Sequence, residues 1–410
     1  MATVPVIPGA GQDRRLRLAF ISSVISLVAG FAAVGSTIPL FNLYRAQDGF
    51  TNADISMAVV SYSAATLITL LVLGRVSGHL GRRPTSIAGM ILLLLACLLL
   101  LEVHDVGVLI FCRVLMGFGA GLASSSLSAY IIDTAPGHPA WLASVASSQT
   151  IMLGLAVGTV VSGALVQFGP WPRQLIFIVV IALLLVSVAL IAISPETVNR
   201  RPGAWRSLRP RVHVPARVGG QLPSAAAILL ATWAAGAFYQ AFVPALVEDQ
   251  LHTSSALIVG VVFAAYMGSS VLGAPLNSRF SAATAQRIGM VSFFVGMIGV
   301  VAAIATGTLM LFIAATLVAG ASQGVAISAT TRNLLHGSNL ADRAPTFSVI
   351  YLLSYSGATI PALVAGHLSD SFSIPQIALG YSAFAFVATV LALVVARNPN
   401  FGHEREHLPS

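Results

Sequence analysis

The chain has 410 residues, of which 57% are hydrophobic and only 8% charged. This composition leaves too little polar surface to cover a water-soluble globule of that size, so it excludes a soluble domain and predicts a protein that lies mostly in lipid. The formal net charge of +8 comes from arginines spread over the ends of apolar segments, where membrane topology and anionic lipid account for them. We therefore expect the lipid bilayer, and not nucleic acid, as a partner.

Twelve apolar segments follow one another along the chain. A bilayer core about 30 Å thick needs roughly 20 apolar residues per helix, and continuously apolar segments of that length favour helices over barrel strands. The predicted spans are residues 18–40, 55–74, 85–101, 108–131, 142–166, 174–194, 224–247, 256–276, 288–306, 308–331, 346–366 and 376–396.

The arginines predict the orientation, because all 21 basic residues of the chain are arginines. An even number of spans puts both termini on one side, and that side receives eighteen arginines. The other side receives Arg45 and Arg173, and Arg113 falls inside a span. By the positive-inside rule both termini are cytoplasmic, in a multi-pass protein expected in the plasma membrane, which is the inner membrane of a bacterium.

The longest polar break predicts two halves. Residues 195–223 read as a cytoplasmic linker between an N-terminal six-helix bundle (18–194) and a C-terminal one (224–396), with cytoplasmic tails at 1–17 and 397–410. A shift of 203 residues superimposes four glycines of one half on four of the other, and a repeat in one orientation is typical of some transporter folds. The pairs are Gly117 with Gly320, Gly121 with Gly324, Gly154 with Gly357, and Gly163 with Gly366; Gly158 and Pro361 are further candidates for helix packing.

The first motif in chain order is Gly74-Arg75-Val76-Ser77-Gly78-His79-Leu80-Gly81-Arg82-Arg83, between the second and third spans. Glycines allow a tight turn there, and arginines hold the inner face through ion pairs and lipid headgroups. Asp133, at the end of the fourth span, is the nearest acidic partner for Arg82 or Arg83 in this topology. Two interpretations remain open: an ion pair that gates transport, or arginines that only set topology.

The second motif is Arg113-Val114-Leu115-Met116-Gly117-Phe118-Gly119-Ala120-Gly121, in the fourth span. An arginine inside a span costs roughly 2.5 to 3.5 kcal/mol on insertion scales, which makes Arg113 a functional candidate. Snorkelling towards the nearby end of the span is the alternative. No acidic residue falls at the predicted midplane, so Asp54, Asp133 and Arg113 are the candidates for proton coupling.

Both motifs resemble those of the major facilitator superfamily, and together with the helix count and the repeat the resemblance covers nearly the whole chain. Gly78 stands where that family usually has Asp. The stretch from Gly154 to Gly163 partly resembles the antiporter signature of family exporters, with Ser162 where the signature has proline. The resemblance implies an all-α fold of two pseudo-symmetric six-helix bundles that alternate access to a central site. It also implies a role for Arg113 in proton transfer or in binding anionic groups.

The same resemblance implies a cavity lined by spans one, four, seven and ten, with contributions from two, five, eight and eleven. Aromatic and amide side chains at these places suit an amphipathic organic solute, although Tyr and Trp also pack between helices. The candidate cavity residues are Ser36, Asn42, Tyr62, Arg113, Gln149, Trp233, Tyr239, Gln240, Tyr266, Gln323, Tyr351 and Tyr355.

The sequence thus favours a monomeric, proton-linked exporter of a small organic solute, a drug or a metabolite. An uptake permease or facilitator for a small metabolite is the first alternative, and a transporter-like membrane sensor is a remote one. Enzyme activity is not expected, because the GxSxG pattern from Gly320 to Gly324 lies inside an apolar segment and lacks the strand that a hydrolase needs before its serine. No cofactor or metal is expected either, since no metal-ligand spacing occurs.

Overall fold

The computed structural model describes residues 10–136, 139, 142–199, 202–203, 205, 208, 214–338 and 340–398. In these residues it contains twelve helices long and apolar enough to cross a membrane, and no strand. The membrane-crossing helices are α1 (Ala10–Gly35), α3 (Asn52–Val72), α5 (Arg82–Leu100), α6 (Val106–Thr134), α7 (Leu142–Phe168), α8 (Leu175–Ile193), α10 (Leu222–Ala241), α12 (Ala256–Ser269), α14 (Ala282–Thr306), α15 (Leu309–Leu335), α16 (Leu340–Leu368) and α17 (Ile374–Val395). The predicted all-α membrane fold is confirmed.

Shorter helices bend or extend the long ones. They are η1 (Ile38–Leu40), α2 (Phe41–Asp48), α4 (Ser77–Leu80), η2 (Ala216–Gln221), α11 (Val243–Asp249), η3 (Ser270–Leu272) and α13 (Gly273–Asn277). Most of the predicted tails and about a third of the predicted linker lie outside the described residues.

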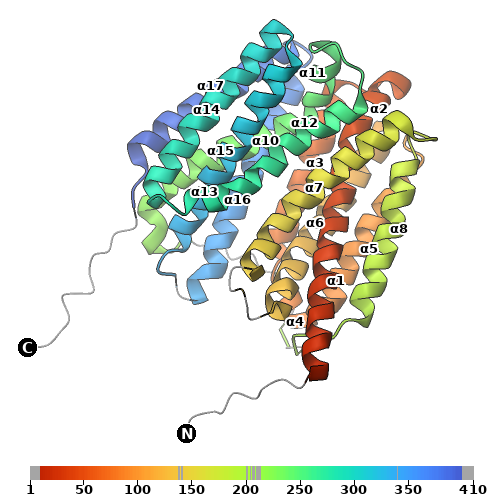
Figure 1. Cartoon of the computed structure of the whole chain (residues 1–410), viewed down its shortest axis with the longest axis vertical. Helices are drawn as coiled ribbons and strands as arrows, with labels where there is room; N and C mark the ends of the chain where they lie inside the picture. Colours follow the sequence, from red (N-terminus) through yellow and green to blue (C-terminus); the bar gives the residue numbers. More distant parts are fainter. Residues whose placement is uncertain are drawn as a thin grey trace, which may run out of the picture.

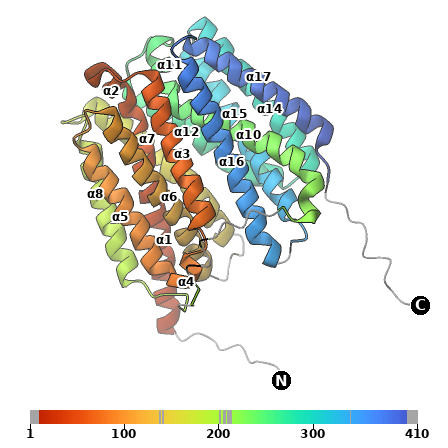
Figure 2. The same cartoon turned by 180° about the vertical axis from the view of Figure 1, so that it is seen from behind.

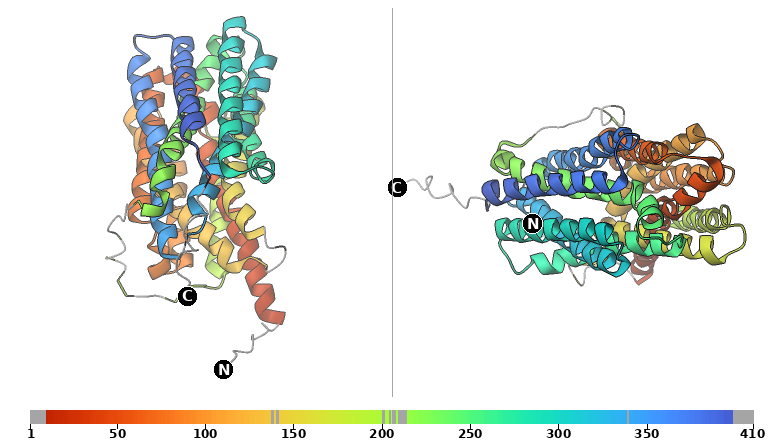
Figure 3. Two further views of the ribbon diagram at one scale, coloured as in Figure 1. Left: turned by 90° about the vertical axis from the view of Figure 1, so that its left-hand side faces the viewer. Right: turned by 90° about the horizontal axis from the view of Figure 1, so that it is seen from above.

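The helices form two groups that lie side by side. Figure 1 shows α1 to α8, coloured red to yellow-green, beside α10 to α17, coloured green to blue, and Figure 2 shows the same division from behind. Viewed from above, the two groups adjoin along one face (Figure 3). Helix α7 packs on α12 and helix α3 packs on α16, so these two pairs form the main seams between the halves.

Successive spans run in opposite directions, which gives the bundle two distinct ends. Helices α1 and α5 begin, and α3 and α6 end, at the end that carries Arg82, which we name the Arg82 end (the bottom of Figure 1). Helices α2 and α11 lie at the opposite end, which we name the Asp48 end. The start of α1 and the end of α17 both belong to the Arg82 end, as an even number of crossings requires.

The repeated glycines inside each half stand where two helix backbones touch. A Cβ atom built at Gly117 of α6 would lie 2.6 Å from the carbonyl oxygen of Tyr62 in α3, and one at Gly320 of α15 would collide with the carbonyl oxygen of Tyr266 in α12. Only glycine permits such an approach, because every other residue carries that atom. Four more of the predicted packing glycines lie equally close to a backbone of their own half: Gly154, Gly158, Gly324 and Gly357.

The last glycine pair serves the contact between the halves. A Cβ atom at Gly163 of α7 would lie 2.5 Å from the carbonyl oxygen of Ala256 in α12. One at Gly366 of α16 would lie 2.8 Å from the Cβ of Ser56 in α3. Both contacts join the halves near the Asp48 end. The repeated glycines therefore lie at helix contacts between the bundles as well as within them.

The first helix of each half breaks at a proline near the Asp48 end. The predicted spans 18–40 and 224–247 are continuous, whereas in the structure α1 stops at Gly35 before Pro39 in η1, and α10 stops at Ala241 before Pro244 in α11. Proline lacks a backbone N–H and clashes with the preceding turn, so each helix ends or bends there. The Asn42 side chain donates a hydrogen bond of 2.7 Å to the carbonyl oxygen of Pro244, which links the two broken ends across the halves.

Candidate functional site

Arg113 is the centre of the candidate site. It lies seven residues into α6, about 10 Å along the helix axis from its start at the Asp48 end, and its side chain is fully buried. Within the described part of the chain it forms no ion pair with a carboxylate. Its guanidinium instead donates hydrogen bonds to the Thr37 hydroxyl (2.9 Å) and to the carbonyl oxygen of Ala58 (3.4 Å).

Aromatic rings supply the rest of the surroundings of this cation. The guanidinium carbon lies 4.8 Å from the ring centroid of Tyr62 and 5.9 Å from that of Phe41. A ring face attracts a cation by about 0.5 to 2 kcal/mol, the larger value applying where water is excluded. The cation is therefore held by neutral groups, and its positive charge has no anionic partner among the described side chains.

The site also reaches into the second half. One Arg113 nitrogen donates a hydrogen bond of 3.4 Å to the side-chain oxygen of Gln240 in α10. This hydrogen bond links Arg113 to the second half. Thr37, Tyr62 and Phe41 all belong to the first half. A movement that parts the halves at this point would lengthen the Arg113–Gln240 distance.

Two predicted tyrosines form a separate pair inside the second half. The rings of Tyr239 and Tyr266 stack with centroids 4.1 Å apart, and both side chains are fully buried. The Tyr239 hydroxyl hydrogen-bonds the Thr316 hydroxyl at 2.8 Å, and the Tyr266 hydroxyl donates to the carbonyl oxygen of Thr232 at 3.1 Å. These partners occupy the hydroxyl groups, so the pair is packed as core in this conformation.

Trp233 and Tyr355 form a third group, on α10 and α16. Their ring centroids lie 4.7 Å apart. The buried Nε1 atom of Trp233 has no hydrogen-bond partner among the described residues. A buried donor without a partner costs free energy, so this nitrogen is available to a polar group of a ligand.

The remaining predicted cavity residues are spread over other contacts. The Ser36 hydroxyl donates to its own helix at the Ala33 carbonyl oxygen (2.8 Å). Gln149 is half-buried and contacts the Ser148 hydroxyl at 3.4 Å. Gln323 is 5% exposed, and Tyr351 is half-buried beside Phe347.

At the Arg82 end, two carboxylates hold the first motif. The Arg82 Nε atom lies 3.0 Å from a carboxylate oxygen of Asp133, and another guanidinium nitrogen donates to the Ser77 hydroxyl at 2.8 Å. Glu196 accepts the backbone N–H groups of Arg82 (2.8 Å) and Arg83 (3.0 Å), one with each oxygen. Sequence reasoning named Asp133 and missed Glu196, whose position directly after the sixth span was the available signal.

Gly81 makes this contact possible. Its φ angle of 111° is one that residues with a side chain avoid, and a Cβ there would lie 2.5 Å from the Glu196 carboxylate. Gly74, at the preceding turn, is close enough to the Leu70 carbonyl that a Cβ would collide with it. The motif glycines thus shape the turn, while the gating role proposed for the arginines stays a prediction.

At the Asp48 end, charged side chains tie the halves together. Arg45 of α2 forms ion pairs with Asp249 (3.1 Å) and Glu248 (3.8 Å) of α11. Gln167 of α7 accepts hydrogen bonds from the Ser255 hydroxyl (2.6 Å) and the backbone N–H of Leu257 (3.2 Å). Sequence reasoning used Arg45 only for topology; an arginine on the arginine-poor side was the signal that could have found this contact.

A second charged group at this end belongs to the first half. Asp48 lies 2.7 Å from Arg173 and 3.0 Å from the His104 ring. Asp54, predicted as a coupling residue, accepts hydrogen bonds from the Thr51 backbone and hydroxyl and so caps α3. Its carboxylate is engaged in this structural role, and its part in coupling stays a prediction.

No group of three or more His, Cys, Asp or Glu side chains in the described residues is arranged to hold a metal ion. The GxSxG pattern lies inside helix α15, where Gly320 packs against α12 and Gly324 against η3. Helical surroundings on both sides of Ser322 differ from the strand and turn that a nucleophile elbow requires.

Comparison with known families decides the class of the protein. The model of the Major Facilitator Superfamily matches residues 20–331, more than half of the chain. The chain belongs to this superfamily. It is therefore a multi-pass membrane protein of a transporter family, as the two motifs indicated.

Individual relatives are more distant. Quinolone resistance protein NorA of Staphylococcus aureus (strain MRSA252) is 26% identical over 108 residues, which cover 26% of this chain and 28% of NorA. Monosaccharide-sensing protein 1 of Arabidopsis thaliana is 41% identical over 86 residues, which cover 21% of this chain and 12% of that protein. The match thus spans about a quarter of NorA's length.

A solved structure shares the fold over most of this chain, although few of the aligned residues are identical. A mutant of the nucleoside transporter NupG matches with a TM-score of 0.69 over 92% of this chain and 100% of that one, at 12% identity. An identity this low establishes the shared fold alone.

Proposed function

We propose that this protein is a proton-linked exporter that moves a small organic solute across the membrane by alternating access, without enzymatic activity. The observation that carries the proposal is Arg113, a fully buried cation in a cage of neutral groups from both halves. A desolvated charge of this kind is costly, so its retention favours a functional role over a packing role. Because the Arg113 charge has no carboxylate partner among the residues that the structure describes, it can attract a hydrogen-bond acceptor or an anion that binds next to the guanidinium.

Rocking of the halves would change this cage. Gln240 belongs to the second half, whereas Thr37 and Tyr62 belong to the first. When the halves separate at the Asp48 end, Arg113 loses the Gln240 contact and gains water, and the attraction between the cation and a bound acceptor falls as the local dielectric rises. This coupling of affinity to conformation is what alternating access needs.

The direction and orientation are parts of the same proposal. The partial similarity to NorA, a quinolone resistance protein, supports export. The arginine distribution supports cytoplasmic termini in the plasma membrane, which makes the Asp48 end external. In this proposal residues 195–223 are the cytoplasmic linker between bundles 18–194 and 224–396. The structure then represents a state that is closed to the outside by the contacts of Arg45, Asp249 and Gln167.

Two alternatives stand beside export. The fold that this chain shares with the nucleoside transporter NupG serves an uptake permease or facilitator equally well. A membrane sensor with a transporter-like body is suggested by the short match to Monosaccharide-sensing protein 1. Solute flux separates them from export, since a facilitator ignores a pH gradient, a sensor carries no flux, and an uptake permease gives net flux in the opposite direction.

The test is flux of a fluorescent quinolone in proteoliposomes, with and without an imposed pH gradient. We expect the gradient to accelerate flux. We expect Arg113→Lys to lower flux at least about tenfold, because the ammonium group of lysine cannot replace the planar set of guanidinium N–H donors and does not stack on the Tyr62 ring. Arg343→Lys, at an exposed position of α16, is the matched control and should transport normally. Flux that ignores the gradient would remove the proton link, and an active Arg113→Lys variant would remove Arg113 from the mechanism.

A further inference from the structure

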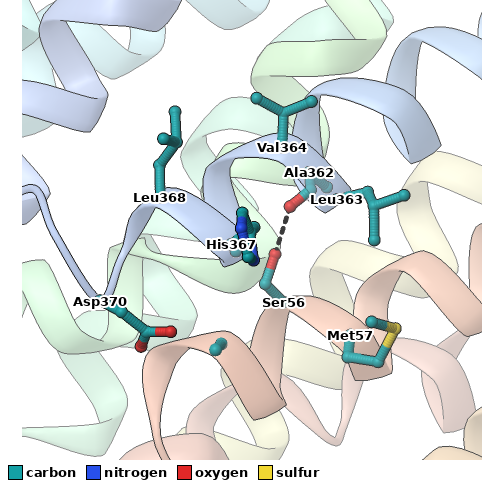
Figure 4. Close-up of a pocket in the computed structure, with 10 residues that line it drawn as sticks. Ser56, Met57, Ala362, Leu363, Val364, His367, Leu368 and Asp370 are labelled. Atoms are coloured by element: carbon teal, nitrogen blue, oxygen red, sulfur yellow. Dashed lines mark hydrogen bonds between the residues drawn. The ribbon is translucent and has the colours of Figure 1, made fainter.

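A pocket of about 450 Å³ opens on the side of the bundle, beside the α3–α16 seam at the Asp48 end. It lies apart from Arg113, and both halves supply its walls. Figure 4 shows the hydrogen bond from the Ser56 hydroxyl to the Ala362 carbonyl oxygen (2.6 Å) at its base. Gly366 packs against Ser56 at the same point and keeps the helices close.

The walls of the pocket are apolar and face outward. Met57, Leu363 and Val364 are 40%, 46% and 52% exposed, and all three lie on membrane-crossing helices. Exposed apolar side chains on such helices contact acyl chains, because water does not reach them in the bilayer core. The chemistry of these walls fits a hydrocarbon chain.

One end of the pocket carries negative charge. Asp370 lies two residues after the end of α16, its side chain is exposed, and within the described chain it has no ion-pair partner. The final carbonyl groups of a helix add a partial negative charge, so the end of α16 and Asp370 both attract a cation. Besides Asp370 the lining, as far as the structure describes it, holds one ionisable side chain, His367 in the last turn of α16, and no arginine, so no permanently charged cation faces an anionic headgroup.

We propose that this pocket binds a membrane amphiphile with a single long hydrocarbon chain and a cationic amine headgroup. The chain lies against Met57 and Leu363, and the amine faces Asp370, which Figure 4 shows on the opposite side of the Ser56–Ala362 hydrogen bond from those two side chains. The bilayer is the source of the ligand. Because the walls come from both halves, the amphiphile binds the conformation in which this seam is closed.

The test uses the full chain in phosphatidylcholine nanodiscs and needs no transport activity. Hexadecylamine and hexadecanol, each with a diazirine in its chain, are photo-crosslinked to the protein, and the labelled peptides are identified by mass spectrometry. We expect the amine to label the peptides of Met57 and Leu363 more than the alcohol does. Asp370→Asn should lower amine labelling there roughly two- to fivefold, as loss of an exposed ion pair does, and leave labelling by the alcohol unchanged.

Matched variants complete the design. Glu102→Gln, which removes an exposed acid at the same end, should change neither signal. Leu363→Trp, which fills the pocket, should lower both signals, whereas Leu379→Trp on the lipid-facing side of α17 should lower neither. Equal labelling by amine and alcohol, as expected if phosphatidylcholine holds the pocket, would overturn the proposal, and so would amine labelling that Asp370→Asn does not change. Either result would leave the flux-based account of Arg113 untouched.

Discussion

The first motif of this chain lacks the Asp that its family usually has there, and other acidic residues contact the motif arginines instead. Gly78 stands at that position, and the arginine turn is held instead by Asp133 from the end of α6 and Glu196 from beyond α8. The Arg82–Asp133 pair is partly exposed, with side-chain accessibilities of 19% and 30%. Such a pair contributes about 1 kcal/mol or less, enough to bias two conformations that differ little in free energy.

A charge exchange tests whether this pair acts during transport. Asp133→Arg and Arg82→Asp should each lower flux, because each replaces the ion pair with two like charges, and the double variant should recover much of the loss. Flux in proteoliposomes is the measurement. Arg83→Asp combined with Asp133→Arg is the control and should not recover, since Asp133 contacts Arg82. A double variant no better than the two single ones would show that the pair has no role of its own.

At the scale of elements, helix α5 starts without a side-chain cap of its own. Its N-cap residue is Gly81, which carries no side chain to accept a hydrogen bond. The Glu196 carboxylate takes that place from a distant part of the sequence and accepts two N–H groups of the first turn. A carboxylate at a helix N-terminus also interacts favourably with the helix dipole. Glu196 therefore fixes the start of the linker to the first half.

Removal of this cap should destabilise the first half. We expect Glu196→Ala to lower the free energy of unfolding by about 1 to 2 kcal/mol, the usual cost of losing a capping side chain, and to lower the midpoint of thermal unfolding in detergent. Glu102→Ala is the control, because its side chain is 78% exposed and caps no helix. Equal midpoints for Glu196→Ala and the unaltered protein would contradict the capping role.

The sequence predicted these elements well where a local pattern defines them. Apolar length predicted the twelve spans, because that feature is written along each segment. It did not predict that Glu196 caps α5 or that Gly163 meets α12, since such partners are set by the packing of segments far apart in the chain. Sequence reasoning placed Tyr62 and Gln240 in one candidate cavity with Arg113, but its contacts with Thr37 and the Ala58 carbonyl depend on packing between segments.

For the whole molecule, the contacts between the halves define one conformation. Asn42, Arg45, Ser56 and Gln167 of the first half all bond to the second half near the Asp48 end. Helices α7 and α12 are held by Gly163 at the same end. In an alternating-access transporter these contacts must break once in each cycle, because the solute leaves or enters through the end that they close.

The measurement that tests this account most directly is flux through a protein locked at the Asp48 end. Ser56→Cys with Gly366→Cys is the pair to cross-link, because a Cβ at Gly366 would lie 2.8 Å from that of Ser56, and the two helices need to part by only about 1 Å to reach the usual disulfide separation. The native Cys97 and Cys112 are buried, and the two single variants under the same oxidant serve as controls. The account predicts that oxidation of the double variant stops flux and that a reductant restores it. Undiminished flux through the fully cross-linked protein would contradict alternating access across this seam.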